Sequence, residues 1–293
     1  MTFQPIRTFP IRPEVKDLLA VGTTGYVGVC RDDSNCVLKW HRPTEEYNPK
    51  DTDCLREIEI EKKIYACLSQ NPHHGIAKLV RTAPEGIYLE RYRNGNVADY
   101  IKKVSEVTLE TRLHWALQVT EAVSYLHDMG VIHYDLKPRN LLVDDSLHIR
   151  VCDFGGSSFK GSVPMVGPCT RYALPGQWDC PPTVQVDLFA LGSLIYELIK
   201  NEPPFHDQPS DQVENLYMRN NFPNMEYMQC GDIIKKCWRQ EYIAAQEVYE
   251  ALRIETQQHL EGIRQLKTEP LANPNPLSSS HTICLPLRFE PCY

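Results

Sequence analysis

The sequence predicts an α+β fold, with strands near the N-terminus and helices dominating the rest. Residues 17–40 hold short apolar runs separated by a glycine-rich turn and by a polar RDDSN segment. This pattern is typical of antiparallel strands joined by tight turns. Residues 108–130 place apolar side chains at helical spacing instead, with Thr108 as a candidate N-cap. Residues 188–199 form an apolar run too short to span a bilayer, which predicts a buried helix.

The composition is that of a globular protein with one large domain or two lobes. The chain has 293 residues, of which 42% are hydrophobic and 24% charged. Its formal net charge of -7 argues against a broad basic face, so we expect no nucleic-acid partner. The N-terminus lacks the apolar run of a signal peptide, and none of the 11 cysteines forms a CxxC pair. We therefore expect a cytoplasmic protein with reduced thiols and no membrane association, with the nucleus left open.

The rest of the N-terminal part is assigned from local patterns. A helix over 54–68 is predicted by Ile64 and Leu68, which recur at a four-residue step. The segments around it are assigned as a lead-in, a polar loop and two strands: 1–16, 42–53, 76–80 and 86–92.

The chain is organised around HYDLKPRN at 133–140, which sets Asp135, Lys137 and Asn140 at short fixed spacing. Asp153 follows in CDFGG, after a segment that can form a hairpin of two short strands. That hairpin would bring Asp153 back beside Asn140. A proton-accepting carboxylate, a lysine and two oxygen ligands suited to magnesium are what phosphoryl transfer requires of a protein.

These motifs together resemble those of a eukaryotic protein kinase of the serine/threonine type, over roughly residues 17–255. The resemblance implies a two-lobed fold, with a small β-rich N-lobe that carries one main helix and a larger, mainly helical C-lobe. It implies transfer of the γ-phosphate of ATP to serine or threonine hydroxyls of a protein substrate, with magnesium as the second cofactor. The kinase domain would span 17–265, divided near residue 92, and 266–293 would be a flexible tail able to dock a partner.

The resemblance also assigns a role to each residue of the motifs. Asp135 would accept the hydroxyl proton, and Lys137 would lie near the γ-phosphate. Asn140 and Asp153 would bind magnesium. Lys39, at the end of a VLK strand, would contact the ATP phosphates. Further ATP-binding residues would come from the glycine-rich turn, the helix and the segment joining the lobes: Gly22, Gly25, Tyr26, Val29, Glu61, Leu89, Glu90 and Tyr92.

Supporting roles fall to His133 and Asp187. His133 opens the catalytic loop, and Asp187 lies in VDLFALG, which resembles the D-x-W-x-x-G helix of the family. On this resemblance, Asp187 would brace the backbone of the catalytic loop from a buried helix.

Two assignments stay open. The partner of Lys39 is Glu57 or Glu61, which lie one turn apart on the same helix face. Glu61 is preferred because it leaves apolar residues at the offsets found in the family, and the other glutamate is then expected to be exposed. The glycine-rich turn matches only in part, since Gly25 stands one place late and Thr24 occupies a glycine position.

Departures from the family pattern concern regulation. Tyr134 replaces the arginine that, in the family, binds the phosphate of a phosphorylated activation loop. The resemblance is therefore to a non-RD kinase, and we expect little dependence of its activity on loop phosphorylation. Gly176 replaces the glutamate of Ala-Pro-Glu, and its arginine partner is missing from residues 242–246, so both ends of a buried ion pair are gone together. In these respects the chain resembles small single-domain kinases of filamentous fungi. The alternative is a pseudokinase scaffold that binds nucleotide and partner proteins without catalysis.

Overall fold

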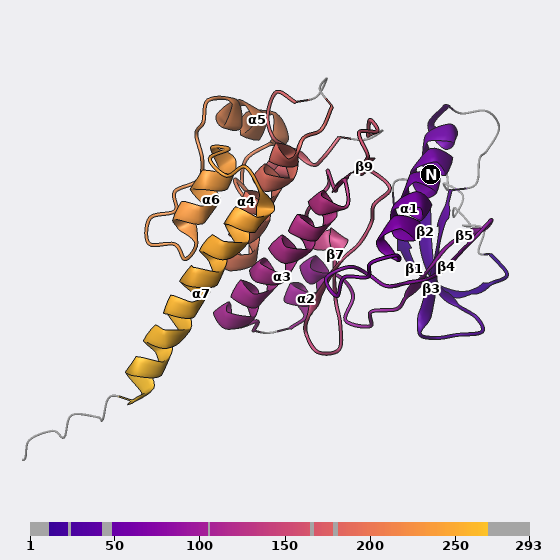
Figure 1. The fold of residues 1–293 in the computed structure, drawn as a ribbon, viewed down its shortest axis with the longest axis horizontal. Coiled ribbons are helices and arrows are strands. Elements are labelled where there is room, and N and C mark those ends of the chain that lie inside the picture. The colour runs from indigo at the N-terminus through magenta and orange to yellow at the C-terminus, as the bar shows by residue number, and fades with distance from the viewer. Residues whose placement is uncertain are drawn as a thin grey trace, which may run out of the picture.

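The expected two-lobed α+β fold is confirmed (Figure 1). The structure is a computed structural model that describes residues 12–22, 25–42, 49–104, 106–164, 167–177 and 181–268. One lobe is a five-stranded antiparallel sheet with a long helix beside it, and the other is built mainly of helices. Among the described residues, no helix has both the length and the apolar character that crossing a bilayer requires.

The sheet of the small lobe has the strand order β1-β2-β3-β5-β4. Because successive side chains of a strand point to opposite faces, the sheet carries two apolar clusters. One contains Val37 and Leu89 and joins the main core, whereas the other contains Tyr26 and Trp40. The elements of this lobe are β1 (Val15–Val21), β2 (Gly25–Cys30), β3 (Cys36–His41), α1 (Pro49–Leu68), β4 (Leu79–Ala83) and β5 (Gly86–Glu90).

Element boundaries in this lobe differ from the sequence predictions. β1 begins at Val15, inside the segment assigned as a lead-in, and α1 begins at Pro49, because proline suits the first turn of a helix. The strand expected at 76–80 is wrong in its first half, since β4 begins only at Leu79. Ile76 instead forms a bridge with Val151, so this segment is tied to the large lobe.

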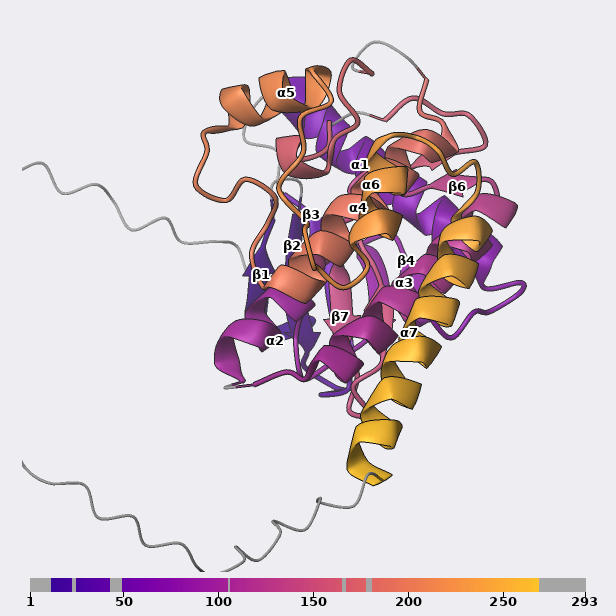
Figure 2. The same cartoon turned by 90° about the vertical axis from the view of Figure 1, so that its left-hand side faces the viewer.

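The large lobe is built around α3 and α4, which pack on each other and carry α7 and α6 on their outer sides (Figure 2). Thr108 caps α3 by accepting a hydrogen bond from the Thr111 N–H, as predicted. α7 runs to Thr268, so the tail and its proposed docking role lie almost entirely outside the described residues. The helices are α2 (Val97–Lys103), α3 (Leu109–Asp128), α4 (Val184–Lys200), α5 (Ser210–Met218), α6 (Gly231–Trp238) and α7 (Ala245–Thr268).

The predicted hairpin after the catalytic loop is confirmed as β7 (Leu141–Val143) and β8 (Ile149–Val151). It returns the chain so that the Cys152 N–H donates to the Asn140 carbonyl at 3.0 Å. Asp153, one residue later, is thereby placed beside the catalytic loop. A second pair, β6 (Val131–Ile132) with β9 (Ser158–Phe159), joins the chain before this loop to the chain beyond Asp153.

Candidate active site

The catalytic loop is fixed by a carboxylate buried in α4. Asp187 is fully buried and accepts hydrogen bonds from the backbone N–H groups of His133 and Tyr134, each at 2.8 Å. Its Oδ2 also lies 2.9 Å from Nε2 of His127, a partner that sequence reasoning missed. Tyr134 has a φ of 69°, a left-handed conformation that a bulky residue adopts only when its surroundings impose it. Asp187 therefore holds the loop in a strained shape.

The fully buried imidazole of His133 makes a second set of contacts beneath the loop. Its Nδ1 accepts from the Asp135 N–H at 3.3 Å, and its Nε2 lies 3.0 Å from the Cys152 carbonyl. With Nδ1 accepting, the ring proton lies on Nε2 and is donated to Cys152. His133 thus links the backbone that carries Asp135 to the backbone that carries Asp153.

Asp135, Lys137 and Asn140 meet at one carboxylate oxygen. Lys137 Nζ lies 2.5 Å from Asp135 Oδ2, and Asn140 Nδ2 donates to the same oxygen at 3.0 Å and to the Asp135 carbonyl at 2.8 Å. Among the described residues, nothing donates to Asp135 Oδ1, and the side chain is 27% exposed. The carboxylate is therefore oriented through one oxygen while the other can receive a proton.

Lys39 bridges two carboxylates from different parts of the chain. Its Nζ lies 2.6 Å from Glu61 Oε2 on α1 and 2.6 Å from Asp153 Oδ1. The lysine partner is thus Glu61 and not Glu57. Burial alone would lower the pKa of Lys39, but the two carboxylates raise it on balance. The lysine charge in turn lowers the pKa of Asp153, so both groups are ionised at neutral pH.

The position of α1 is set by the residue after Asp153. Phe154 is fully buried and packs edge-on against Tyr65 of α1, with ring centroids 5.1 Å apart. Its backbone N–H donates to Glu61 Oε1 at 3.3 Å. The Asp153 backbone has a φ of 70°, the second left-handed non-glycine residue of the site. Phe154 therefore couples the placement of Glu61 to that of Asp153.

Glu57 corrects one expectation. It is only 4% exposed, whereas the glutamate not paired with Lys39 was expected to face solvent. Its side chain lies against Gly155, where an added Cβ would come within 3.4 Å of the Glu57 Cβ. The sequence prediction failed here because the burial of Glu57 depends on Gly155, which lies far away along the chain.

Three of the predicted nucleotide-facing residues of the sheet, Val29, Lys39 and Leu89, share one face. Val29 pairs with Val37, which pairs with Leu89, and Lys39 lies two residues further along the same face of β3. Beyond Leu89, Glu90 ends β5 and Tyr92 leads into the large lobe, its hydroxyl accepting from the Lys78 N–H at 3.2 Å. Within the described residues, the Tyr92 N–H donates no backbone hydrogen bond.

The glycine-rich turn is placed differently from what the resemblance implies. Tyr26 pairs with Trp40 on the face of the sheet opposite Lys39, and the two rings pack with centroids 5.5 Å apart. Tyr26 therefore does not cover the cleft. A Cβ at Gly25 would come within 2.5 Å of the Trp40 carbonyl oxygen, so glycine there is explained by strand packing. Gly22 donates to the Gly25 carbonyl at 2.8 Å, and the tip between them, including Thr24, lies outside the described residues.

Comparison with known proteins decides the family. Residues 14–252 match the protein kinase domain family. The chain belongs to the protein kinase family. It is 28% identical over 176 residues to a probable cAMP-dependent protein kinase catalytic subunit of Encephalitozoon cuniculi, covering 57% of this chain and 53% of that one.

Other kinases give the same result. Identity is also 28% over 260 residues to a probable serine/threonine-protein kinase of Dictyostelium discoideum, covering 82% of this chain and 27% of the relative. The sequence identity to human 3-phosphoinositide-dependent protein kinase 1 is 28% over 159 residues, covering 49% of this chain and 28% of the relative. The matches to these relatives span about half of their length or less.

In this kinase the end of the activation segment lacks the usual glutamate for a local reason. Gly176 has a φ of +76°, a left-handed conformation that suits glycine and disfavours a glutamate. On the other side, where the arginine partner is missing, Gln185 Nε2 donates to the Tyr242 carbonyl at 3.0 Å. This bond links α4 to the chain before α7. The activation segment itself is joined to the helical lobe by hydrogen bonds from other residues.

The chain just before Gly176 provides those anchors. Arg171 donates to two backbone carbonyls after α4, and the Tyr172 hydroxyl hydrogen-bonds to the Glu197 carboxylate within α4. Burial raises the pKa of Glu197 to about 7, although Lys102 and Arg139 act in the opposite direction.

This raised pKa predicts a pH-dependent stability. A carboxyl whose pKa is higher in the folded state than its ordinary 4.5 contributes stability that is present below pH 4.5 and lost as pH rises through about 7. Glu197→Gln mimics the protonated group and should gain stability relative to the wild type between about pH 5 and pH 8. Urea denaturation of both proteins at these pH values measures the difference. An unchanged difference would show that Glu197 titrates normally.

Proposed function

We propose that the protein is a kinase that uses ATP and magnesium to phosphorylate serine or threonine hydroxyls of protein substrates. The observation that carries this proposal is the connected set Glu61–Lys39–Asp153, with both ion-pair distances at 2.6 Å and Phe154 packed beneath it. A largely enclosed lysine between two carboxylates is costly unless all partners are present, so the intact set favours a retained catalytic site over the pseudokinase scaffold. The DLKPRN form of the catalytic loop favours serine and threonine over tyrosine.

The donor set fits a magnesium ion. The Nδ2 group of Asn140 donates hydrogen bonds to Asp135, which leaves the amide oxygen of Asn140 available to a cation. Asp153 engages Lys39 through Oδ1, and its side chain is 48% exposed, which leaves Oδ2 accessible. Amide and carboxylate oxygens are the ligands that magnesium prefers. When bound, the ion would neutralise charge on the phosphates during transfer.

The chain's own residues supply orientation and a proton acceptor. Asp135 would receive the hydroxyl proton at Oδ1, while Lys137, 2.5 Å from Oδ2, carries a positive charge beside the reacting groups. The backbone of Glu90 and Tyr92 would contact adenine, with Val29 and Leu89 on the face that Lys39 shares. For localisation, we propose the cytoplasm.

Label transfer tests this function. Purified protein incubated with γ-labelled ATP and magnesium should label itself or a generic protein substrate, and Asp135→Asn should not. The nucleotide affinity of both proteins should be measured in parallel. Tight ATP binding without label transfer by the wild type would favour the pseudokinase scaffold instead.

We further propose that activity does not require phosphorylation of the activation segment. Tyr134 is buried and uncharged where an arginine would pair with a phosphate. The catalytic loop obtains its order from Asp187 instead.

Phosphatase treatment should therefore leave the rate of phosphoryl transfer within about twofold of the untreated enzyme, because no cation at residue 134 depends on a phosphate. Mass spectrometry before and after treatment checks that phosphate was removed. A rate that collapses on dephosphorylation and returns after incubation with ATP would refute the proposal.

A further inference from the structure

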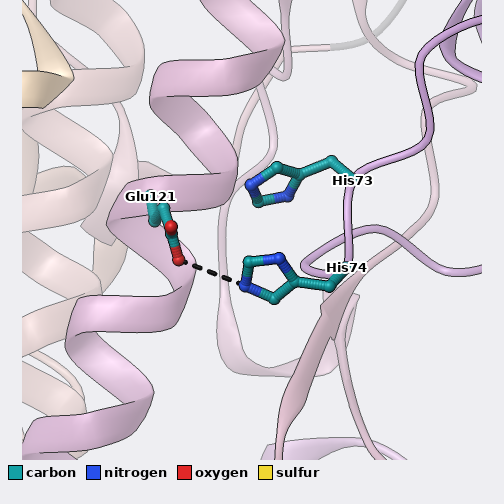
Figure 3. A group of neighbouring side chains, drawn as sticks. All are labelled: His73, His74 and Glu121. Carbon is teal, nitrogen blue, oxygen red and sulfur yellow. Dashed lines mark ion pairs between the residues drawn. The ribbon is translucent and has the colours of Figure 1, made fainter.

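The loop between α1 and β4 presents two adjacent imidazoles to a carboxylate on α3. His73 and His74 come from this loop, and Glu121 comes from the middle of α3 (Figure 3). Both rings point toward the helix that carries Glu121, and His74 Nε2 lies 3.2 Å from Glu121 Oε2. One nitrogen or oxygen atom from each residue lies within 4.8 Å of the other two.

We propose that His73, His74 and Glu121 form a binding site for a zinc-type divalent cation, which joins the small lobe to α3. Two imidazoles and one carboxylate are a donor set that zinc accepts, whereas magnesium and calcium prefer oxygen ligands alone. None of the three residues belongs to the set around Lys39, Asp135 and Asp153, so the proposal does not depend on the proposed phosphoryl transfer.

The distances between the three ligand atoms suit a tetrahedrally coordinated cation after small side-chain movements. Ligand bonds of 2.0 to 2.1 Å place two tetrahedral ligand atoms about 3.3 Å apart. The pair His74 Nε2–Glu121 Oε2 is already at 3.2 Å, and the others have to approach by at most roughly 1.5 Å. The His74 side chain is 62% exposed and that of Glu121 is 40% exposed, so both can adjust and the remaining coordination positions are open to water.

The loop is held against α3 in advance, which lowers the cost of organising the ligands. The Tyr125 hydroxyl donates to the Asn71 carbonyl at 2.6 Å, and the His73 ring stacks on Tyr125 with centroids 4.7 Å apart. Gly75 lies so close to α3 that an added Cβ would come within 2.8 Å of the Ala122 Cβ. Asn71 and Gly75, which are not ligands, thus help to place the backbone that carries the two imidazoles.

The local charges permit a cation. The positive charge of Arg150 would oppose cation binding, because this guanidinium lies close enough to donate a hydrogen bond to the His74 carbonyl. Its guanidinium is also paired with Asp144 at 2.6 Å, which offsets that charge.

One hydrogen bond has to change when the cation binds. The Gly75 N–H donates to His73 Nδ1 at 3.0 Å, so the neutral ring carries its proton on Nε2. Coordination through Nε2 displaces that proton and puts one on Nδ1, which opens the bond from Gly75. The Gly75 amide resonance should therefore shift when zinc is added.

The test is zinc binding by the full chain after treatment with a chelator, measured by calorimetry without ATP. The wild type should bind one zinc ion at this site, and His74→Gln and Glu121→Gln should each weaken that binding about tenfold or more. His206→Gln is the matched control. His206 pairs with Glu202 at 3.4 Å, and its side chain is 53% exposed. The control substitution therefore removes a comparable histidine–glutamate pair elsewhere on the surface.

Cobalt serves as a second probe, because thiolate ligands give intense charge-transfer absorption and imidazoles do not. The proposal is supported if bound cobalt shows no thiolate charge-transfer absorption. The spectrum of bound cobalt should also disappear in His74→Gln and persist in His206→Gln. Equal zinc affinity in all variants, thiolate absorption, or an unmoved Gly75 resonance would overturn it. The melting temperature of each metal-free variant should match that of the wild type, which excludes misfolding as the cause. Absence of kinase activity would leave these results unaffected.

Discussion

Asp135→Asn should lower the rate of phosphoryl transfer by about 10³-fold, while ATP affinity stays within about twofold of the wild type. Asparagine has the same shape as aspartate but cannot accept the hydroxyl proton. The change also removes the negative partner of Lys137, which lies 2.5 Å from Asp135 Oδ2. ATP affinity should persist because the Glu61–Lys39–Asp153 set does not include Asp135. Initial rates at saturating ATP, together with nucleotide titration, measure the two effects separately.

Asp232→Asn is the matched control for this experiment. Its side chain is 92% exposed on α6, so the same chemical change is made far from the cleft. The control should keep the wild-type rate. If Asp135→Asn retained that rate too, the proton would be accepted elsewhere and the assigned role of Asp135 would be wrong.

Asp187→Ala should lower the free energy of unfolding by about 3 to 5 kcal/mol, among the largest effects of any single substitution in this chain. Asp187 is fully buried and receives hydrogen bonds from His133, Tyr134 and His127. Alanine leaves these donors without an acceptor inside the core. The melting temperature should fall on the order of 10 °C, and activity should fall with it because the catalytic loop loses its support. Calorimetry and chemical denaturation check the result.

Two further variants sharpen this test. Asp187→Asn keeps the volume and one oxygen acceptor, so its loss of stability should be intermediate. Asp232→Ala removes an exposed carboxylate and should change stability by less than about 0.5 kcal/mol. A melting temperature of Asp187→Ala close to that of the wild type would mean that other contacts fix the catalytic loop.

The sequence predicts the fold and the meeting of Asp135, Asn140 and Asp153 because short-range patterns specify them. A two-stranded hairpin between Asn140 and Asp153 is enough to bring them together, and alternation along β3 fixes the face of Lys39. Helix periodicity left Glu57 and Glu61 as alternatives, and the resemblance to the kinase family favoured Glu61, which the ion pair with Lys39 confirms.

Features that depend on long-range packing were not accessible in this way. His127 faces Asp187 across the α3–α4 contact, and nothing in its local sequence distinguishes it from a surface histidine. Glu57 is buried because Gly155 approaches it from a distant part of the chain. Tyr26 was assigned to the cleft from its place in a motif, but its strand register turns it toward Trp40.

The position of Lys39 between Glu61 and Asp153 has a thermodynamic consequence for ligand binding. A single ammonium group satisfies two carboxylates at 2.6 Å each, so an anion that draws it away from Asp153 leaves that carboxylate with uncompensated charge. The affinity of Asp153 for a cation then rises, and linkage requires the cation to raise the affinity for the anion by the same factor. Under the proposed function, phosphate and metal would therefore bind here as a cooperative pair, because Lys39 would pair with Asp153 in the free enzyme and with the phosphate in the complex.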